Sequence, residues 1–363
     1  MKLAALGLLG LVLVALDRTH ALTAYAAAYF AALGAALGAL VWLQIALVTR
    51  ARWLLPVRRQ LENAAGLVPV MGILFVPILL ASGDIYPWGH APGDLGALVV
   101  DGKRPAWLHA ALAFGFWTVV AELLRRWSRQ GDALPSVALA ERQRSLAAGT
   151  LPFFGLVVTM FAYDFLMTLE GPFHSTIYGV LFFSGSAVSG LAIAVVSGVA
   201  NRASLPPELG RPHFFAQGKM LLAMVMFWTY IELSQLILIW IANLPAEVGW
   251  YEERVTGPWR PVAFAVPICC FALPFLVLLS RRFKQRPERV AAMGVYLLVA
   301  HWLDAVWLVL PPLRPSGPAL ADVGAALAMA GVFIVGMALR ARGAAAYPQQ
   351  DPDLASALAF EDA

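Results

Sequence analysis

Apolar segments of roughly 20 residues recur along the whole 363-residue chain and constrain its fold more than any other feature. About 20 helical residues cross the ~30 Å hydrocarbon core of a bilayer. The segments are continuously apolar rather than alternating, which favours helices over a transmembrane barrel. Hydrophobic residues make up 60% of the chain and charged residues 13%, against about 45–50% and 25% in soluble domains. We therefore expect an all-α integral membrane protein.

Ten segments qualify as membrane spans. They cover residues 3–16, 22–48, 64–81, 107–124, 150–169, 175–200, 214–242, 259–280, 290–310 and 320–339. The first segment is short and follows Met1-Lys2, a beginning that a secretory signal peptide also shows. Asp17 and Arg18 stand where a signal peptide carries small neutral residues. Retention as a helix is therefore favoured, and cleavage near Thr19-His20-Ala21 is the alternative.

The basic residues alternate from one side of the predicted spans to the other. Twenty of the 26 Lys and Arg residues lie on the side of the two termini, and six lie on the opposite side. Basic residues concentrate in cytoplasmic loops, so we expect both termini in the cytoplasm and the chain in a bacterial inner membrane. A missed or false span would scramble this distribution, which supports ten spans. The net charge of +4 follows the loops, so we expect a lipid membrane and no nucleic acid as partner.

The sequence contains no segment long enough for a soluble domain. We expect residues 1–340 to form one membrane domain. Residues 341–363 are small, polar and acidic, which predicts a disordered cytoplasmic tail. Cys269 and Cys270 are the only cysteines and lie in the middle of a span. They exclude a disulfide framework and cannot supply the four thiolates of an iron–sulfur cluster, so we expect them to act as small apolar side chains.

Ionisable residues inside the spans are the candidate functional residues. Asp164 lies in the outer half of its span, Glu232 and Gln235 share a face of another, and His301 and Asp304 lie one turn apart in a third. Three helices therefore place carboxylates at similar depth. An intramembrane charge costs several kcal/mol unless it is paired or hydrated.

Two interpretations of these residues differ in kind. In the functional one, they form a proton path or a site for a quinone head, with aromatic side chains such as Trp302 and Trp307 around the ring. In the structural one, they are hydrogen bonds between helices, worth about 0.6–2 kcal/mol each. Glu62 and Glu122 are weaker candidates for an inner proton path, because both lie close enough to span ends to reach the interface.

The histidines give no ligand set for a metal or haem. His301 and Asp304 supply two ligands on one turn, and no second histidine lies in the middle of a span. A bis-histidine haem therefore lacks its second ligand. We expect no cofactor bound by this chain, so any electron transfer would use partner subunits. Glu170, in the turn Glu-Gly-Pro-Phe-His, is expected to be a solvated turn residue.

Three segments together resemble one known family. They are 163–186 (Tyr-Asp-Phe-Leu-Met-Thr-Leu-Glu through Phe-Phe-Ser-Gly-Ser), 218–251 (Gly-Lys-Met through Asn-Leu-Pro to Gly-Trp-Tyr) and 301–311 (His-Trp-Leu-Asp-Ala-Val-Trp-Leu-Val-Leu-Pro). The chain resembles the F subunit of alternative complex III, a quinol:cytochrome c oxidoreductase. That family is a branch of the NrfD-like (polysulfide reductase membrane subunit) superfamily. The resemblance is specific over 150–311 and looser over 1–149.

The resemblance implies a fold and a set of partners. It implies ten helices in two four-helix bundles, spans 2–5 and 6–9, flanked by spans 1 and 10. It implies a respiratory subunit without its own cofactor, not catalytic alone, with quinone or quinol as a candidate ligand. Haem c and iron–sulfur clusters would be carried by a multihaem cytochrome c and an iron–sulfur subunit. A sister NrfD-like subunit would be the better candidate for quinol oxidation.

The chain departs from the family pattern in two places. Glu232 stands where the family has a small or aromatic residue, and residues 211–217 lack an expected His-Asp pair. Two other classes also remain open. A secondary transporter would show spans broken at matching positions in two halves, for which Pro69 and Pro77 against Pro267 and Pro274 are a thin indication. A purely structural scaffold of a respiratory complex is the third interpretation.

Overall fold

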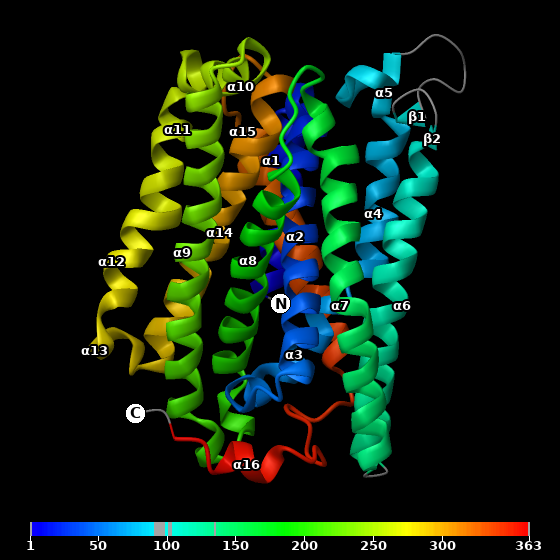
Figure 1. Cartoon of the computed structure of the whole chain (residues 1–363), viewed down its shortest axis with the longest axis vertical. Coiled ribbons are helices and arrows are strands. Elements are labelled where there is room, and N and C mark those ends of the chain that lie inside the picture. Colours follow the sequence, from blue (N-terminus) through cyan, green and yellow to red (C-terminus); the bar gives the residue numbers. More distant parts are fainter. Residues whose placement is uncertain (1, 91–98, 101–103, 134–135, 362–363) are drawn as a thin grey trace.

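The computed structural model describes residues 2–90, 99–100, 104–133 and 136–361 (Figure 1). Within this part, nine helical segments are long and apolar enough to cross a membrane, and α1 adds a shorter apolar helix over Gly7–Leu16. Besides helices, this part contains only one pair of two-residue antiparallel strands, β1 (Val99–Val100) and β2 (Arg104–Pro105). The prediction of an all-α, multi-pass membrane protein is confirmed.

The long helices run side by side along the length of the molecule (Figure 1). We call the end that carries α16 the tail end and the opposite end the α10 end. The helices in the described part are α1 (Lys2–Leu16), α2 (Ala21–Val48), α3 (Arg58–Ala65), α4 (Val68–Leu80), α5 (Ser82–Ile85), α6 (Ala106–Ala133), α7 (Val137–Phe165), α8 (Tyr178–Ala200), α9 (Arg211–Ala242), α10 (Pro245–Val255), α11 (Arg260–Pro267), α12 (Leu273–Leu279), α13 (Arg281–Lys284), α14 (Pro287–Leu313), α15 (Leu320–Ala341) and α16 (Leu354–Leu358).

Local sequence sets where several of these helices begin and end. The Ser136 hydroxyl accepts from the Leu139 amide and caps α7. Asn243 ends α9 with a left-handed φ of 48°, and Pro245 then starts α10 at a position where a proline needs no amide partner. The predicted span 64–81 is divided, because α3 ends before Gly66 and α4 begins with Pro69 in its first turn.

Helices α2 and α8 form the centre of the molecule and approach each other at backbone distance. A Cβ atom added to Gly38 would lie 1.7 Å from the carbonyl oxygen of Ser186, and one added to Gly190 would lie 2.1 Å from the Gly38 carbonyl carbon. The Trp42 indole also donates to the Ala187 carbonyl oxygen at 2.8 Å. Only glycine permits this contact, so the two glycines set the spacing of the central pair.

Helix α1 packs along α15 through small residues. A Cβ on Gly10 would lie 2.4 Å from the Ala328 nitrogen, and one on Gly324 would lie 2.9 Å from the Gly10 carbonyl oxygen. At the start of α15, the Ala321 amide donates to the Asp17 carboxylate at 3.3 Å. Small residues thus bring α1 and α15 together at backbone distance.

An aromatic core fills the space between α2, α4, α6 and α7. Phe75 lies at its centre, with ring centroids 5.5 Å from both Tyr29 and Phe161 and 5.6 Å from Phe114. The Tyr29 hydroxyl donates to the Met71 carbonyl oxygen at 2.9 Å. On the outer surface, by contrast, apolar side chains such as Trp240 on α9 are exposed, as expected against lipid.

Residues 344–361 lie across the tail end, which differs from the disordered tail expected from composition. The Gln60 amide donates to the Ala346 carbonyl oxygen at 3.3 Å, and a His213 ring nitrogen lies 3.1 Å from the Ala357 carbonyl oxygen. The Phe360 ring packs 5.0 Å from the His213 ring. The difference arises because the tail does not need its own core: the ends of α3 and α9 supply its partners.

Candidate proton-handling site

His301 and Asp304 are buried on α14 at the centre of the site. His301 Nδ1 lies 3.5 Å from Asp304 Oδ2, too far for a strong hydrogen bond. The Trp228 indole of α9 donates to the same oxygen at 3.1 Å. Gly185 of α8 lies against the pair, because a Cβ there would be in van der Waals contact, 3.4 Å from both Asp304 Oδ2 and His301 Nδ1. The site is therefore built where α8, α9 and α14 meet.

Several buried polar atoms in this region make no hydrogen bond to any other described residue. They are both ring nitrogens of His301, Oδ1 of Asp304 and Oε1 of Glu232. An unsatisfied buried polar group costs about 1–3 kcal/mol. Most buried polar groups are paired, and such clusters commonly serve a ligand, internal water or catalysis. These atoms are therefore suited to binding internal water or a polar ligand and to passing protons along such groups.

Glu232 extends the cluster towards the α10 end. Its carboxylate lies within electrostatic range of Asp304 on one side and Arg254 on the other. Gln235, one turn further along α9, accepts a hydrogen bond from the Ser175 hydroxyl at 2.8 Å. Glu232, Gln235, His301 and Asp304 thus share one region of the structure.

Tyr251 of α10 lies beside Glu232 and Gln235. Burial raises the pKa of the Tyr251 hydroxyl, and the nearby Glu232 carboxylate adds to this, while Arg254 opposes it. The hydroxyl therefore keeps its proton and can donate a hydrogen bond. Sequence analysis identified this tyrosine only as part of a segment that resembles a known family.

Arg254 and Glu170 form a buried ion pair at the α10 end. The Arg254 side chain is 1% exposed and meets Glu170 Oε2 at 2.8 Å. The same guanidinium donates to the Trp250 carbonyl oxygen at 2.8 Å and lies 3.7 Å from the Trp250 ring. Burial raises the pKa of Glu170, with Arg254 opposing the shift. Glu170 is thus mostly buried rather than a solvated turn residue. Sequence reasoning missed this because Arg254 is 84 residues away in the chain.

Asp164 lies with His109 instead of with the cluster. Its Oδ2 lies 2.7 Å from His109 Nδ1, between α6 and α7. Both side chains are partly exposed, 22% for His109 and 17% for Asp164. The groups that act on Glu232 are Asp304 and Arg254. The similar depth of the three carboxylates was therefore a poor guide to contact, because helices at one depth can face different neighbours.

Glu62 and Glu122, the weaker candidates, are paired with arginines at the tail end. The Glu62 carboxylate is 2.7 Å from Arg59 Nη1 and accepts from the Ser128 hydroxyl at 2.6 Å. Glu122 pairs with Arg340 of α15 and lies 3.6 Å from Arg125. Both carboxylates hold α3, α6 and α15 together, so each of them already has an arginine as its charged partner.

A π-helical turn, Ile268–Ala272, interrupts the predicted span 259–280 next to the site. Pro267 and Pro274 flank it, and prolines remove amide donors from a helix. The turn directs the Cys270 thiol to the Ala300 carbonyl oxygen on α14, at 3.3 Å. Such turns often occur at functional sites. The adjacent prolines are the sequence signal for it.

Among the described residues, no group of three His, Cys, Asp or Glu side chains converges as a metal site would require. The expectation that this chain binds no metal stays a prediction. The sequence matches no protein-family model and no curated protein.

Proposed function

We propose that this chain is an integral-membrane subunit of a quinol:cytochrome c, or other periplasmic acceptor, oxidoreductase of the alternative complex III kind. Its part is to carry protons in the respiratory chain, without a cofactor of its own. The observation that supports proton handling is the set of buried side-chain atoms on Glu232, His301 and Asp304 that have no hydrogen-bond partner among the described residues. The family rests on the resemblance of residues 163–186, 218–251 and 301–311.

The proposed topology counts α1 as a tenth span. One four-helix bundle then comprises α2, α3–α4, α6 and α7, and the other comprises α8, α9, α11–α12 and α14. α1 and α15 flank them. By the distribution of basic residues, the tail end faces the cytoplasm of a bacterial inner membrane and the α10 end faces the periplasm.

In the proposed mechanism, protons move only through the second bundle. Asp304 and His301 hold a proton near the middle of the span, and Glu232 exchanges it towards Tyr251 and the Glu170–Arg254 pair. Carboxylates and imidazoles relay protons through hydrogen bonds of about 2.6–3.2 Å or through one intervening water. The first bundle has the aromatic core around Phe75 in the corresponding interior.

A second candidate function is the binding of a quinone head at His109 and Asp164. The Asp164 carboxylate holds His109 Nδ1, which orients the ring and frees Nε2 to bind a quinone or quinol oxygen. Both side chains are partly exposed at the surface between α6 and α7. A hydrophobic carrier reaches such a site from the bilayer.

Purification of the tagged protein from native membranes in mild detergent tests the assignment. We expect sister membrane, cytochrome c and iron–sulfur subunits to co-purify, with c-type haem absorbance and quinol-dependent reduction of cytochrome c. A colourless, solitary protein would contradict the proposal and leave the transporter interpretation.

Two conservative substitutions test the cluster itself. Asp304→Asn and Glu232→Gln keep size and polarity but remove the ionisable group. We expect an intact, coloured complex whose quinol-dependent turnover falls about 10²-fold, the usual scale for a lost proton-transfer group. Glu252→Gln, an exposed carboxylate on α10, is the matched control and should keep the wild-type rate. Wild-type turnover in all three variants would favour a scaffold.

A further inference from the structure

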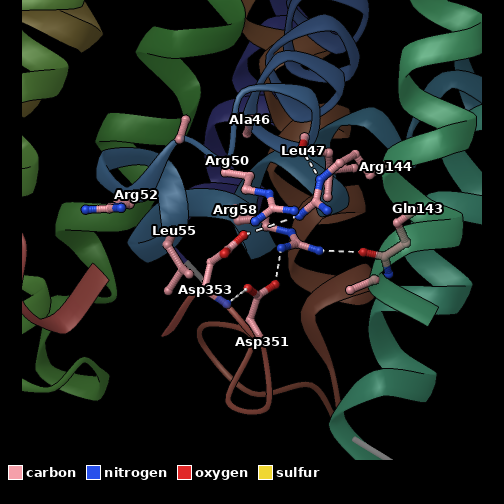
Figure 2. A pocket seen from close by; sticks show the side chains of 12 residues that line it. Ala46, Leu47, Arg50, Arg52, Leu55, Arg58, Gln143, Arg144, Asp351 and Asp353 are labelled. Atoms are coloured by element: carbon pink, nitrogen blue, oxygen red, sulfur yellow. Dashed lines mark hydrogen bonds and ion pairs between the residues drawn. The ribbon is translucent and has the colours of Figure 1, made fainter. Parts of the chain in front are cut away.

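A pocket opens at the tail end, between the last turn of α2, the first turns of α7 and the chain after Tyr347 (Figure 2). Its upper wall is apolar, with Ala46 and Leu47 of α2. Figure 2 shows Arg50, Arg58 and Arg144 gathered at its centre, with Asp351 and Asp353 of the tail directed towards them from below.

The deep end of the pocket is closed by well-formed contacts. Arg58 is 9% exposed and pairs with Asp351, and its second nitrogen donates to the Gln143 side-chain oxygen at 2.6 Å. The Asp351 carboxylate also accepts the Asp353 amide at 2.8 Å, which shapes the turn before α16. Its two carboxylate oxygens thus serve the fold.

The mouth of the pocket is held much more loosely. Glu141 Oε1 accepts from Arg144 Nη1 at 2.5 Å. By contrast, Arg144 Nη2 lies 3.6 Å from Asp353 Oδ2, and Arg50 Nη2 lies 3.6 Å from Glu141 Oε1. These distances exceed those of a good charge-assisted hydrogen bond, about 2.7–2.9 Å. The Arg50 side chain is 58% exposed, and that of Asp353 is 30% exposed. Arg144 Nη2 and the Arg50 guanidinium therefore keep donors free for another anion, which would lie beside the Glu141 carboxylate.

The position of Arg50 at the end of a predicted membrane span indicates which kind of anion the pocket would bind. Leu47 belongs to the last turn of a helix that is long and apolar enough to span a membrane, and Arg50 follows within three residues. This junction of apolar and basic residues lies where a span meets the headgroup layer. Basic pockets at span ends bind the phosphates of anionic lipids. A phospholipid would place its acyl chains against the apolar residues Ala46 and Leu47 and its phosphate against the arginines.

We propose that the mouth of this pocket binds a phosphate group, that of an anionic phospholipid or a free phosphate, between Arg50 and Arg144. The Asp353 carboxylate competes for the same guanidinium. Arginine forks match phosphate oxygens in two-point hydrogen bonds. The Asp353 carboxylate of the tail therefore competes with phosphate for Arg144. The contact between Asp353 and Arg144 weakens when the phosphate is bound.

Lipid titration of the full-length protein in an uncharged detergent tests the proposal. Native mass spectrometry and the thermal unfolding midpoint are followed with dioleoyl phosphatidylglycerol, dioleoyl phosphatidylcholine, and sodium phosphate against sodium chloride at equal ionic strength. We expect binding of phosphatidylglycerol and not of phosphatidylcholine. Arg50→Gln should weaken that binding about fivefold, and Asp353→Asn should strengthen it.

Arg286→Gln removes an exposed arginine from the turn before α14 and is the matched control. It should leave lipid binding unchanged. A phosphatidylglycerol effect that depends on Arg50 identifies a lipid headgroup as the ligand, and an inorganic phosphate effect that depends on Arg50 identifies a free phosphate. Equal binding of both lipids without a phosphate effect, equal losses in the Arg50 and Arg286 variants, or an unchanged Asp353→Asn variant would each overturn the proposal.

Discussion

At the scale of single residues, the site is defined by atoms whose bonding is incomplete. Asp304 has one oxygen bonded to Trp228 and the other without a partner among the described residues, while Arg254 nearby is fully engaged. Arg254 donates to the Trp307 carbonyl oxygen, one turn from Asp304 on α14, so two different bonding situations lie close together. Arg254 and Glu170 fix the α10 end, and Asp304 with His301 keeps capacity for protons.

The Trp228 indole donor can be removed without removing its ring. Trp228→Phe keeps the packing against His301, whose ring lies 5.6 Å away, but takes the hydrogen bond from Asp304. We expect a loss of about 1–3 kcal/mol in stability, measured as the midpoint of thermal unfolding in detergent. Trp240→Phe, at an exposed position, is the control. Equal midpoints for the two variants would show that the bond to Asp304 contributes nothing.

The Glu170–Arg254 pair predicts a pH dependence with a definite sign. Burial raises the folded-state pKa of Glu170 above the ordinary value of 4.5. The folded chain then binds the proton more readily, so this contribution to stability is full below about pH 4.5 and is lost as pH rises through the folded pKa. Glu170→Gln should flatten that part of the unfolding profile. An unchanged slope would contradict the burial argument.

At the scale of secondary-structure elements, glycine positions decide how closely helices approach. Gly38 has no room for a Cβ, whereas a Cβ on Gly155 of α7 would meet nothing within 4 Å. Both positions are helical, so helix propensity acts equally on them. The difference between the two glycines therefore comes from packing. The same element-scale reasoning explains the divided spans, which break at Gly66 and between Pro267 and Pro274.

A matched pair of substitutions measures this packing. Gly38→Ala should lower stability by about 3 kcal/mol or more, because α2 and α8 must separate to admit the methyl group. Gly155→Ala should raise stability by about 0.5–1 kcal/mol through helix propensity alone. Thermal unfolding of the two purified proteins gives the comparison. Equal effects would mean that the central contact is more pliable than its distances indicate.

At the scale of the whole molecule, the two sets of helices differ in what fills them. Aromatic rings around Phe75 occupy the space between α2, α4, α6 and α7, while α8, α9 and α14 enclose His301 and Asp304. The tail joins both sets from one end by contacting Gln60 and His213. The aromatic core and the buried His301–Asp304 pair thus lie among different helices.

The ordered tail can be tested by hydrogen exchange. Backbone amides of Leu354 and Ala357 donate within the tail, at 3.0 Å in each case. We expect them to exchange at least tenfold more slowly than in an isolated peptide of the same sequence. Phe360→Ala, which removes the ring packed on His213, should abolish that protection. Exchange at the peptide rate in the unaltered chain would instead restore the disordered tail inferred from composition.

Sequence predicted the helices far better than the contacts between them. Hydropathy locates a span because the bilayer requires about 20 apolar residues, and Glu232, Gln235, His301 and Asp304 could be assembled because they stand at matching depths. Asp164 shares that depth but faces His109, since rotation about a helix axis is set by tertiary packing. The tail was misjudged for a related reason: Asp351 is ordered by Arg58, 293 residues away.

The backbone contact between Gly38 and Gly190 has a consequence for the kind of transport that this molecule can support, of a solute or of protons. A carrier that works by alternating access rocks one half against the other around its substrate. In the proposed two-bundle arrangement, α2 and α8 meet at backbone distance and are joined by the Trp42 hydrogen bond, so rocking of one bundle against the other would break this contact. Protons need no such movement, because they hop between fixed side chains. The rigid contact between α2 and α8 therefore favours the proposed proton conduction over the transport of a solute by alternating access.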